Sequence, residues 1–330
     1  MLFAVDQGAS KTQALLLTED GSILSAATTG GACYFAVGVE TAFQALLDAA
    51  EQVTSLAGKS LSDITSVYAG MAGANWPDEF AMLHEEWKKR FHVEHVTVSN
   101  DSIIALRAGS GRENGIVLCA GSAFNCAVQV DGRAEEVLNN YVEGNDQGGT
   151  ALGDRTLQAV FESRLGIREE TVLTGRLLEY FGYDDVTALL LGRDRKTLRH
   201  QRRTVVPILL KAAEENDRVA LDVVGEFSRS VSRYATSSLR RYGLVGKDCD
   251  VVLSGGVFKA ETPLFFETIA SEVHGVSQQA RVVNAEFEPV VGAALLGLRE
   301  IGAAPSALER CVQDARSMNL GRFPAMGNGA

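Results

Sequence analysis

The apolar residues of the first 110 positions fall into short continuous runs and longer stretches of helical periodicity. Short runs bounded by polar or glycine turns predict buried strands, and apolar positions that recur every three or four residues predict helices. Between 39 and 56, for example, Phe43, Leu46, Ala50 and Val53 share one helical face. The pattern predicts strands at 2–6, 13–17, 22–27, 66–70 and 96–99 and helices at 39–56, 79–90 and 102–108.

The same order of elements begins again near residue 115. The first hairpin holds a glycine turn and closes at Asp20-Gly21; a second hairpin at 115–130 does the same and closes at Asp131-Gly132. Later segments predict strands at 250–254 and 281–285 and helices at 155–165, 205–214, 219–241, 263–274 and 290–301. A chance match of one hairpin would not place both hairpins at the head of an alternating region. We therefore interpret the chain as a duplicated βββαβαβα unit.

The duplication predicts an α/β protein whose two similar lobes face one another across a cleft. We expect the N-terminal lobe at 1–112, joined by a C-terminal helix at about 303–320, and the C-terminal lobe at 113–302, with a helical insertion at about 155–241. Ligands of such lobes bind where turns leave the ends of strands. Four glycine turns fall at such ends, namely Gly8, 70–73, Gly121 and Gly255-Gly256.

Composition limits the classes of partner that we expect the protein to bind. The formal net charge of −11 disfavours nucleic acid and anionic membrane, because both reward clustered Lys and Arg. The one basic run, 193–203, is interrupted by Asp194 and apolar residues, and we interpret it as a solvated helix face. The five cysteines are scattered and lack the spacing of metal ligands, and no apolar run approaches the length of a membrane span. We expect a cytoplasmic protein.

Two common nucleotide-binding motifs are absent from the chain. The lysine of Ser10-Lys11-Thr12 lacks the flanking glycines of a Walker A loop, and no GxGxxG follows a predicted strand. An ATP site would therefore be built from hairpin turns, whose backbone N–H groups and hydroxyls can face phosphate. Asp6 ends the first strand beside such a turn, where a carboxylate can hold Mg²⁺.

Four motifs together resemble one family. They are Asp6-Gln-Gly-Ala-Ser-Lys-Thr12, Gly121-Ser-Ala-Phe-Asn125, Leu253-Ser-Gly-Gly-Val257 and Gly292-Ala-Ala-Leu-Leu-Gly297. They look like the two phosphate loops, the adenosine motif and the following helix of the BadF/BadG/BcrA/BcrD-type ATPases. Within that family they are similar to the N-acetylglucosamine kinases of the sugar kinase, Hsp70 and actin superfamily. The resemblance covers nearly the whole chain and implies two ribonuclease H-like lobes around an interlobe ATP cleft.

The resemblance also implies a set of nucleotide-binding residues. Asp6 would hold Mg²⁺. The residues that would contact ATP are Gly8, Ser10, Lys11, Thr12, Gly121, Ser122, Ala212, Gly255, Gly256, Val257 and Phe258.

Asn100-Asp101 lies between the two units, at the end of a strand and the start of a helix. Local sequence favours a helix cap for Asp101, since Asp is a preferred cap residue. In the resembling kinases the Asp at this position is the general base that takes the proton of the sugar hydroxyl, and one residue can hold both roles. The sugar contacts that the resemblance implies are Asp101, Phe124, Asn125, Gly148, Gly149 and Asp154.

Several positions depart from the family pattern. Gln7, Ala9 and Ala123 stand where the phosphate loops have glycine, and an alanine there is strained if the position needs positive φ. Gly148 replaces an aromatic residue, Arg155-Thr156-Leu157 replaces Glu-Gly-Ser, and Cys33 or Tyr34 stands at a usual sugar-binding Asn. Trp76 and Trp87 are interpreted as packing residues, although Trp76 could border the cleft.

Three functions remain open from the sequence. The first is an ATP- and Mg²⁺-dependent kinase that phosphorylates a primary hydroxyl of an amino sugar, with N-acetylglucosamine favoured over glucosamine and N-acetylmuramic acid. The second is a non-catalytic sugar or nucleotide sensor of the same fold. The third is a redox-coupled activator ATPase, which would need cysteines such as Cys119 and Cys126 at an iron–sulfur cluster. Many relatives are dimers, so a homodimer is also open.

Overall fold

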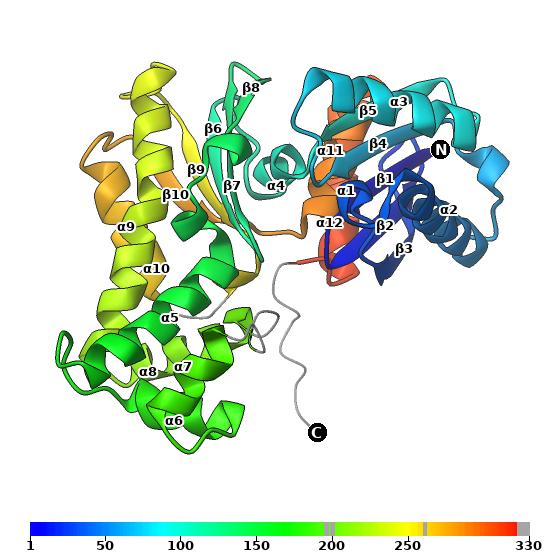
Figure 1. Cartoon of the computed structure of the whole chain (residues 1–330). Coiled ribbons are helices and arrows are strands. Elements are labelled where there is room, and N and C mark those ends of the chain that lie inside the picture. Colours follow the sequence, from blue (N-terminus) through cyan, green and yellow to red (C-terminus); the bar gives the residue numbers. More distant parts are fainter. Residues whose placement is uncertain (195–197, 199–201, 260–262, 322–330) are drawn as a thin grey trace.

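The computed structural model of the chain describes residues 1–194, 198, 202–259 and 263–321. Two five-stranded sheets form the two lobes (Figure 1). The N-terminal sheet has the order β3-β2-β1-β4-β5, and the other has the corresponding order β8-β7-β6-β9-β10. In each sheet the central strand is the first in sequence. It pairs antiparallel with the second strand of its sheet and parallel with the fourth strand of that sheet. The predicted duplication is confirmed.

The strands are short and their central members are buried. The N-terminal sheet contains β1 (Leu2–Gln7), β2 (Lys11–Leu17), β3 (Ile23–Gly30), β4 (Ser66–Met71) and β5 (His95–Asn100). The other sheet contains β6 (Gly115–Ala120), β7 (Phe124–Val130), β8 (Arg133–Val137), β9 (Asp250–Ser254) and β10 (Arg281–Asn284). β1 and β9 are buried along their whole length, as expected for strands covered on both faces.

Helices cover both faces of the N-terminal sheet. One face packs on α1 (Tyr34–Val37), α2 (Val39–Leu56) and α3 (Pro77–Phe91), with Phe3, Phe43 and Trp87 in the core between them. The opposite face packs on α11 (Pro289–Glu300) and α12 (Pro305–Ser317). The backbone N–H of Ile23 donates to the Asp314 carboxylate at 2.9 Å, which ties α12 to β3. The last two helices therefore pack on the first sheet (Figure 1).

One helix, α4 (Asp101–Gly109), lies between the lobes (Figure 1). It packs against strands of both sheets and against α11. A Cβ on Gly292 of α11 would lie 1.9 Å from the carbonyl oxygen of Ile104, so only glycine permits this close approach. The first residue of α4 is thereby held at the junction of the two lobes.

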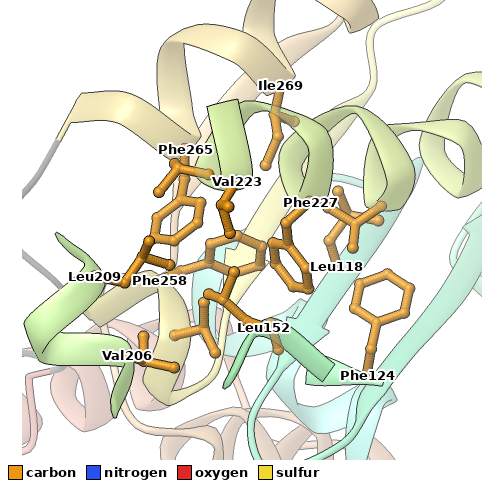
Figure 2. Close-up of a cluster of buried hydrophobic side chains, with 14 of the residues drawn as sticks. Leu118, Phe124, Leu152, Val206, Leu209, Val223, Phe227, Phe258, Phe265 and Ile269 are labelled. Atoms are coloured by element: carbon orange, nitrogen blue, oxygen red, sulfur yellow. The ribbon is translucent and has the colours of Figure 1, made fainter. Parts of the chain in front are cut away.

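The helical insertion of the C-terminal lobe surrounds one large hydrophobic core. Its members are α5 (Gly148–Arg164), α6 (Val172–Phe181), α7 (Val186–Asp194), α8 (Val206–Glu214) and α9 (Arg218–Arg241), and α10 (Pro263–His274) packs against α9. The described residues also form five short 3₁₀ turns: η1 (Leu61–Asp63), η2 (Asn139–Tyr141), η3 (Gly144–Asp146), η4 (Arg202–Val205) and η5 (Gly256–Lys259). Figure 2 shows part of this core, with Leu152, Phe227 and Phe258 in it.

The structure differs from the predicted elements at several places. α5 begins at Gly148 rather than at 155, because its glycine-rich first turn is stabilised by contacts with a distant loop instead of by helix-forming residues. β8 is an edge strand of mostly charged sequence, and α6 and α7 are short, so apolar periodicity identified none of them. No helix in the described part of the chain is long and apolar enough to cross a bilayer.

Candidate active site

Asp6 is buried at the end of β1. The pKa of its carboxyl is raised from 3.8 to about 7, mainly by burial and next by the negative charge of Asp101. Lys11 and Lys259 act in the opposite direction, and Glu288 adds to the increase. The structure therefore brings Asp6 and Asp101, two predicted site residues far apart in sequence, close enough to interact electrostatically.

The helix cap at the start of α4 is Asn100 rather than Asp101. The Asn100 side chain accepts the backbone N–H of Ser102 at 2.9 Å, and its amide donates to the carbonyl of Ala74 at 3.0 Å and to the side chain of Asn75 at 2.9 Å. Asp101 is the first helical residue. The capping role that local sequence suggested for Asp101 thus belongs to its neighbour.

The Asp101 carboxyl has an environment suited to a weak base. Loss of water around it raises the pKa from 3.8 to about 6, although hydrogen bonds from the backbone N–H groups of Ser102 and Asp101 oppose this increase. Such a group is ionised near neutral pH and still basic enough to accept a proton.

Asn125 of β7 joins the C-terminal lobe to this helix start. Its amide lies 3.3 Å from the Asn100 side-chain oxygen and 3.4 Å from the Ser102 hydroxyl, and its own oxygen accepts the backbone N–H of Cys126. Phe124 points the other way, into the core of the lobe (Figure 2). Strand alternation separates the two neighbours, so the predicted sugar contact of the Phe124 side chain is wrong.

The first loop is a tight turn between β1 and β2. The Gly8 N–H donates to the Lys11 carbonyl at 3.0 Å, and the Gly8 carbonyl accepts the N–H of Ala32 at 3.2 Å. Ser10 is exposed at the tip of the turn, whereas the Thr12 side chain is buried within the lobe. Thr12 therefore does not present its hydroxyl at the surface of the loop.

The second loop is held against the start of α5. The carbonyl of Gly121 accepts the N–H of Gly149 at 2.8 Å, and the carbonyl of Ser122 accepts that of Thr150 at 3.2 Å. Gly148 has a φ of +60°, and a Cβ there would lie 2.3 Å from the Ala123 carbonyl oxygen. The aromatic residue of the family pattern would not fit at this position.

Neither loop alanine occupies a strained conformation. The described non-glycine residues with positive φ are His92, Asp131, Asn216 and Asn319, so Ala9 and Ala123 are not among them. The anticipated backbone strain at these two positions is absent.

The third glycine turn follows β9. Gly255 has a φ of +95°, and a Cβ there would lie 2.5 Å from the backbone of Ala120, directly before the second loop. Gly256 is exposed, whereas the side chains of Val257, Phe258 and Ala212 are buried in the hydrophobic core. The side chains of these three residues therefore pack in the hydrophobic core rather than at the surface of the turn, and their contact with ATP remains a prediction.

A cluster of charges that the sequence analysis missed lies beside Asp6. Lys11 donates to one oxygen of Glu288 at 3.0 Å, and Lys259 donates to the other. Burial alone would raise the pKa of Glu288, but the hydrogen bonds from the two lysines outweigh it and hold that pKa below its ordinary value. No local motif identifies Glu288, since its partners are 277 and 29 residues away in sequence.

Two arginines of the basic run reach the candidate site. Arg202 contacts both oxygens of Asp154 at 2.8 Å, and Arg203 donates to the Ser122 hydroxyl of the second loop. Arg202 is half-buried against Asp154, so the interpretation of this run as a solvated face is wrong for that residue, whereas Arg203 is exposed as that interpretation expects. Residues 195–197 and 199–201 lie outside the described residues. Asp154 thus meets an arginine, a partner that the sequence motif did not predict.

A cavity of about 690 Å³ lies beside α4 and is lined by residues of both lobes. Asn75, Trp76 and Asn100 line it from the N-terminal lobe, and Tyr141 lines it from the other. The Trp76 side chain is 49% exposed, whereas Trp87 is fully buried against Phe3 and Phe43. Trp87 is thus a packing residue as predicted, and Trp76 borders the space between the lobes.

A model of one known protein family matches most of the chain. The model of the family described as "BadF/BadG/BcrA/BcrD ATPase family" matches residues 4–297. Glucosamine kinase GspK of Vibrio cholerae is 27% identical over 186 residues, which is 54% of this chain and 61% of that protein. The alignment therefore spans less than two thirds of the Vibrio protein.

Two further relatives cover more of the chain. The N-acetylmuramic acid/N-acetylglucosamine kinase of Clostridium acetobutylicum is 21% identical over 273 residues, or 81% of this chain and 88% of that protein. A crystal structure of a proposed N-acetylglucosamine kinase from Chromobacterium violaceum has a TM-score of 0.68 at 20% identity and covers 89% of this chain and 98% of that one. The structural likeness establishes the fold.

Proposed function

Because this chain belongs to the BadF/BadG/BcrA/BcrD ATPase family, we propose that it is an ATP-dependent kinase that phosphorylates a primary hydroxyl of an amino sugar. One observation carries the proposal. Asn100 caps α4, so the Asp101 carboxyl stands at the junction of the lobes with a raised pKa and without the capping role. Such a group can act as a general base toward a hydroxyl.

The reaction assigns a role to each part of the site. Asp101 takes the proton of the sugar hydroxyl, and the hydroxyl oxygen forms a bond to the γ-phosphorus of ATP. The bond from that phosphorus to the β–γ bridging oxygen breaks, and ADP leaves with the electron pair. The loops at Gly8, Gly121 and Gly255 would contact the nucleotide through backbone N–H groups other than those of Gly8 and Gly121, which donate within their own loops. The Ser10 and Ser122 hydroxyls would contact the phosphates.

The residues at the end of β1 fit a divalent cation. Burial, and next the negative charge of Asp101, raise the pKa of Asp6, and a bound cation would offset both effects. Asp6 is the residue that would hold Mg²⁺. When bound, Mg²⁺ would neutralise negative charge on the phosphates during transfer.

The names of the relatives favour an amino sugar as the acceptor. Glucosamine, N-acetylglucosamine and N-acetylmuramic acid are the sugars in those names, and N-acetylglucosamine remains our preferred substrate. Asn125 is adjacent to the start of α4 and can donate to and accept from neighbouring hydroxyls. We also propose a cytoplasmic enzyme whose partner is a small sugar rather than nucleic acid or membrane; a homodimer stays an expectation.

An assay of ADP release across these three sugars and plain glucose tests the proposal. The wild-type protein should release ADP with at least one amino sugar, and Asp101→Asn should lower kcat by about 10²- to 10⁴-fold. The wild-type kcat/KM should rise with pH through about 6, because Asp101 must be ionised to accept a proton. Nucleotide binding with no turnover on any sugar would instead favour the sensor.

The redox-coupled alternative receives no support from the second loop. Cys126 is buried in the core, and burial raises the pKa of its thiol to about 12. A cluster ligand needs an accessible thiolate. In the parts of the chain that the structure describes, no group of three or more His, Cys, Asp or Glu is arranged to hold a metal ion.

A further inference from the structure

The 3₁₀ turn η4 carries an arginine toward the second loop and is itself firmly placed. A Cβ on Gly153 of α5 would lie 1.9 Å from the carbonyl oxygen of Arg202, so the two backbones are in direct contact. The Arg202 guanidinium contacts both carboxylate oxygens of Asp154, and the Tyr180 hydroxyl donates to the Thr204 hydroxyl at 2.9 Å. The residues on either side of Arg203 are thus both anchored.

The Arg203 side chain extends from this anchored backbone to the second loop. Its Nη1 donates to the hydroxyl of Ser122, and its Cβ lies 3.7 Å from the Cβ position of Gly149. Arg203 is exposed and Ser122 is half-buried, so the guanidinium lies at the solvent side of the loop. A nucleotide phosphate placed on the Ser122 hydroxyl would lie within reach of this guanidinium.

Acidic side chains offset the lysines around the first loop, so a basic side chain at the second loop would favour the binding of phosphates. Lys11 and Lys259 are both engaged by Glu288, and Asp6 and Asp101 add two further carboxyl groups. Without Mg²⁺, these five side chains carry two positive charges against three acidic groups, so the side chains alone leave no excess positive charge for a triphosphate. An arginine at the opposite loop offsets this deficit, and its planar fork matches phosphate oxygens.

We propose that Arg203 is a nucleotide-binding residue whose guanidinium contacts the β- and γ-phosphates of ATP beside Ser122. The inference rests on the proposed function only in requiring that the protein bind ATP. It adds a side chain from the helical insertion to a site otherwise built from glycine turns. The Ser122 hydroxyl orients the guanidinium before the nucleotide binds.

Titration calorimetry with AMPPNP and with AMP, both in the presence of Mg²⁺ and without sugar, tests this assignment. Arg203→Gln should weaken AMPPNP binding by about ten- to a hundredfold, the usual effect of losing hydrogen bonds to a charged group. AMP binding should not change, because AMP lacks the β- and γ-phosphates. Arg203→Lys keeps the positive charge but lacks the planar guanidinium, so its loss of AMPPNP affinity should be intermediate.

Arg240→Gln, at an exposed position near the end of α9, is the matched control and should bind both nucleotides as the wild type does. Unchanged AMPPNP binding in both Arg203 variants overturns the inference, and so does an equal loss of AMPPNP and AMP binding, which would indicate distortion of the loop. If Arg203→Gln does not fold, Arg203→Lys decides. A wild-type protein that binds neither nucleotide would instead refute the proposed ATP dependence itself.

Discussion

At the scale of single residues, the start of α4 assigns helix capping and proton acceptance to two neighbouring residues. Asn100 is 2% exposed and makes the capping contacts, and Asp101 keeps a carboxyl of raised pKa. Sequence patterns placed Asp6, Asp101 and Asn125 near the ends of predicted elements, and in the structure they lie near the end of β1, at the start of α4 and near the start of β7. Their roles remain predictions. Glu288 and Arg203 could not be located this way, since their partners are distant in sequence and belong to no recognised motif.

The Asp6 carboxyl should lower the free energy of unfolding at neutral pH. The pKa of Asp6 is about 7 in the folded protein, above its ordinary value of 3.8. Between these two pH values the unfolded chain loses the Asp6 proton more readily than the folded protein does. The stability present at low pH is therefore lost as the pH rises through 7. Asp6→Asn cannot ionise. Its Tm, measured by differential scanning calorimetry without nucleotide, should exceed that of the wild type by about 3 °C or more at pH 8.

The same comparison at pH 4 provides the internal control, because Asp6 is then neutral in the folded state and only about half ionised in the unfolded state, so the difference in Tm should be small. An equal difference at pH 4 and pH 8 would show that packing, rather than ionisation of Asp6, sets the stability of the variant.

At the scale of elements, the first turn of α5 shows what sequence patterns omit. Periodicity predicted the helix from 155, yet the helix begins at Gly148 because the second loop supplies hydrogen-bond acceptors for its first N–H groups. The sequence contains the two glycines but not the loop that meets them. The core strand β9 was predicted to the residue, and β1 and β4 to within one residue, since their apolar runs are continuous.

Gly148→Ala should therefore damage both stability and nucleotide binding. The added Cβ would lie 2.3 Å from the Ala123 carbonyl oxygen at a φ of +60°, so we expect a loss of about 2 kcal/mol or more in the free energy of unfolding. Urea denaturation measures this loss, and AMPPNP affinity should fall as the second loop shifts.

Gly175→Ala is the matched control within α6, because nothing lies within 4 Å of its Cβ position. This variant should gain up to about 1 kcal/mol from helix propensity. If the two alanine variants have the same stability, the close contact between α5 and the second loop does not exist.

At the scale of the whole molecule, two helices connect the lobes. α4 contacts both sheets, and α11 crosses it at Gly292 and then packs on the N-terminal sheet (Figure 1). Duplication in the sequence predicted two similar lobes with the same order of elements along the chain. It could not predict how the lobes meet, because Glu288 and its lysines, like the contact of Asn125 with Asn100, form only in the assembled molecule.

The central claim is that this assembled site transfers a phosphoryl group to the primary hydroxyl of an amino sugar. Phosphorus NMR of a reaction containing ATP, Mg²⁺ and N-acetylglucosamine, glucosamine or N-acetylmuramic acid tests it most directly. A phosphate ester on a CH₂ group couples to two protons, so the wild-type product should give a triplet, and Asp101→Asn should form it at least about a hundredfold more slowly. Release of inorganic phosphate alone, a doublet from a secondary hydroxyl, or an undiminished triplet with Asp101→Asn would contradict the account.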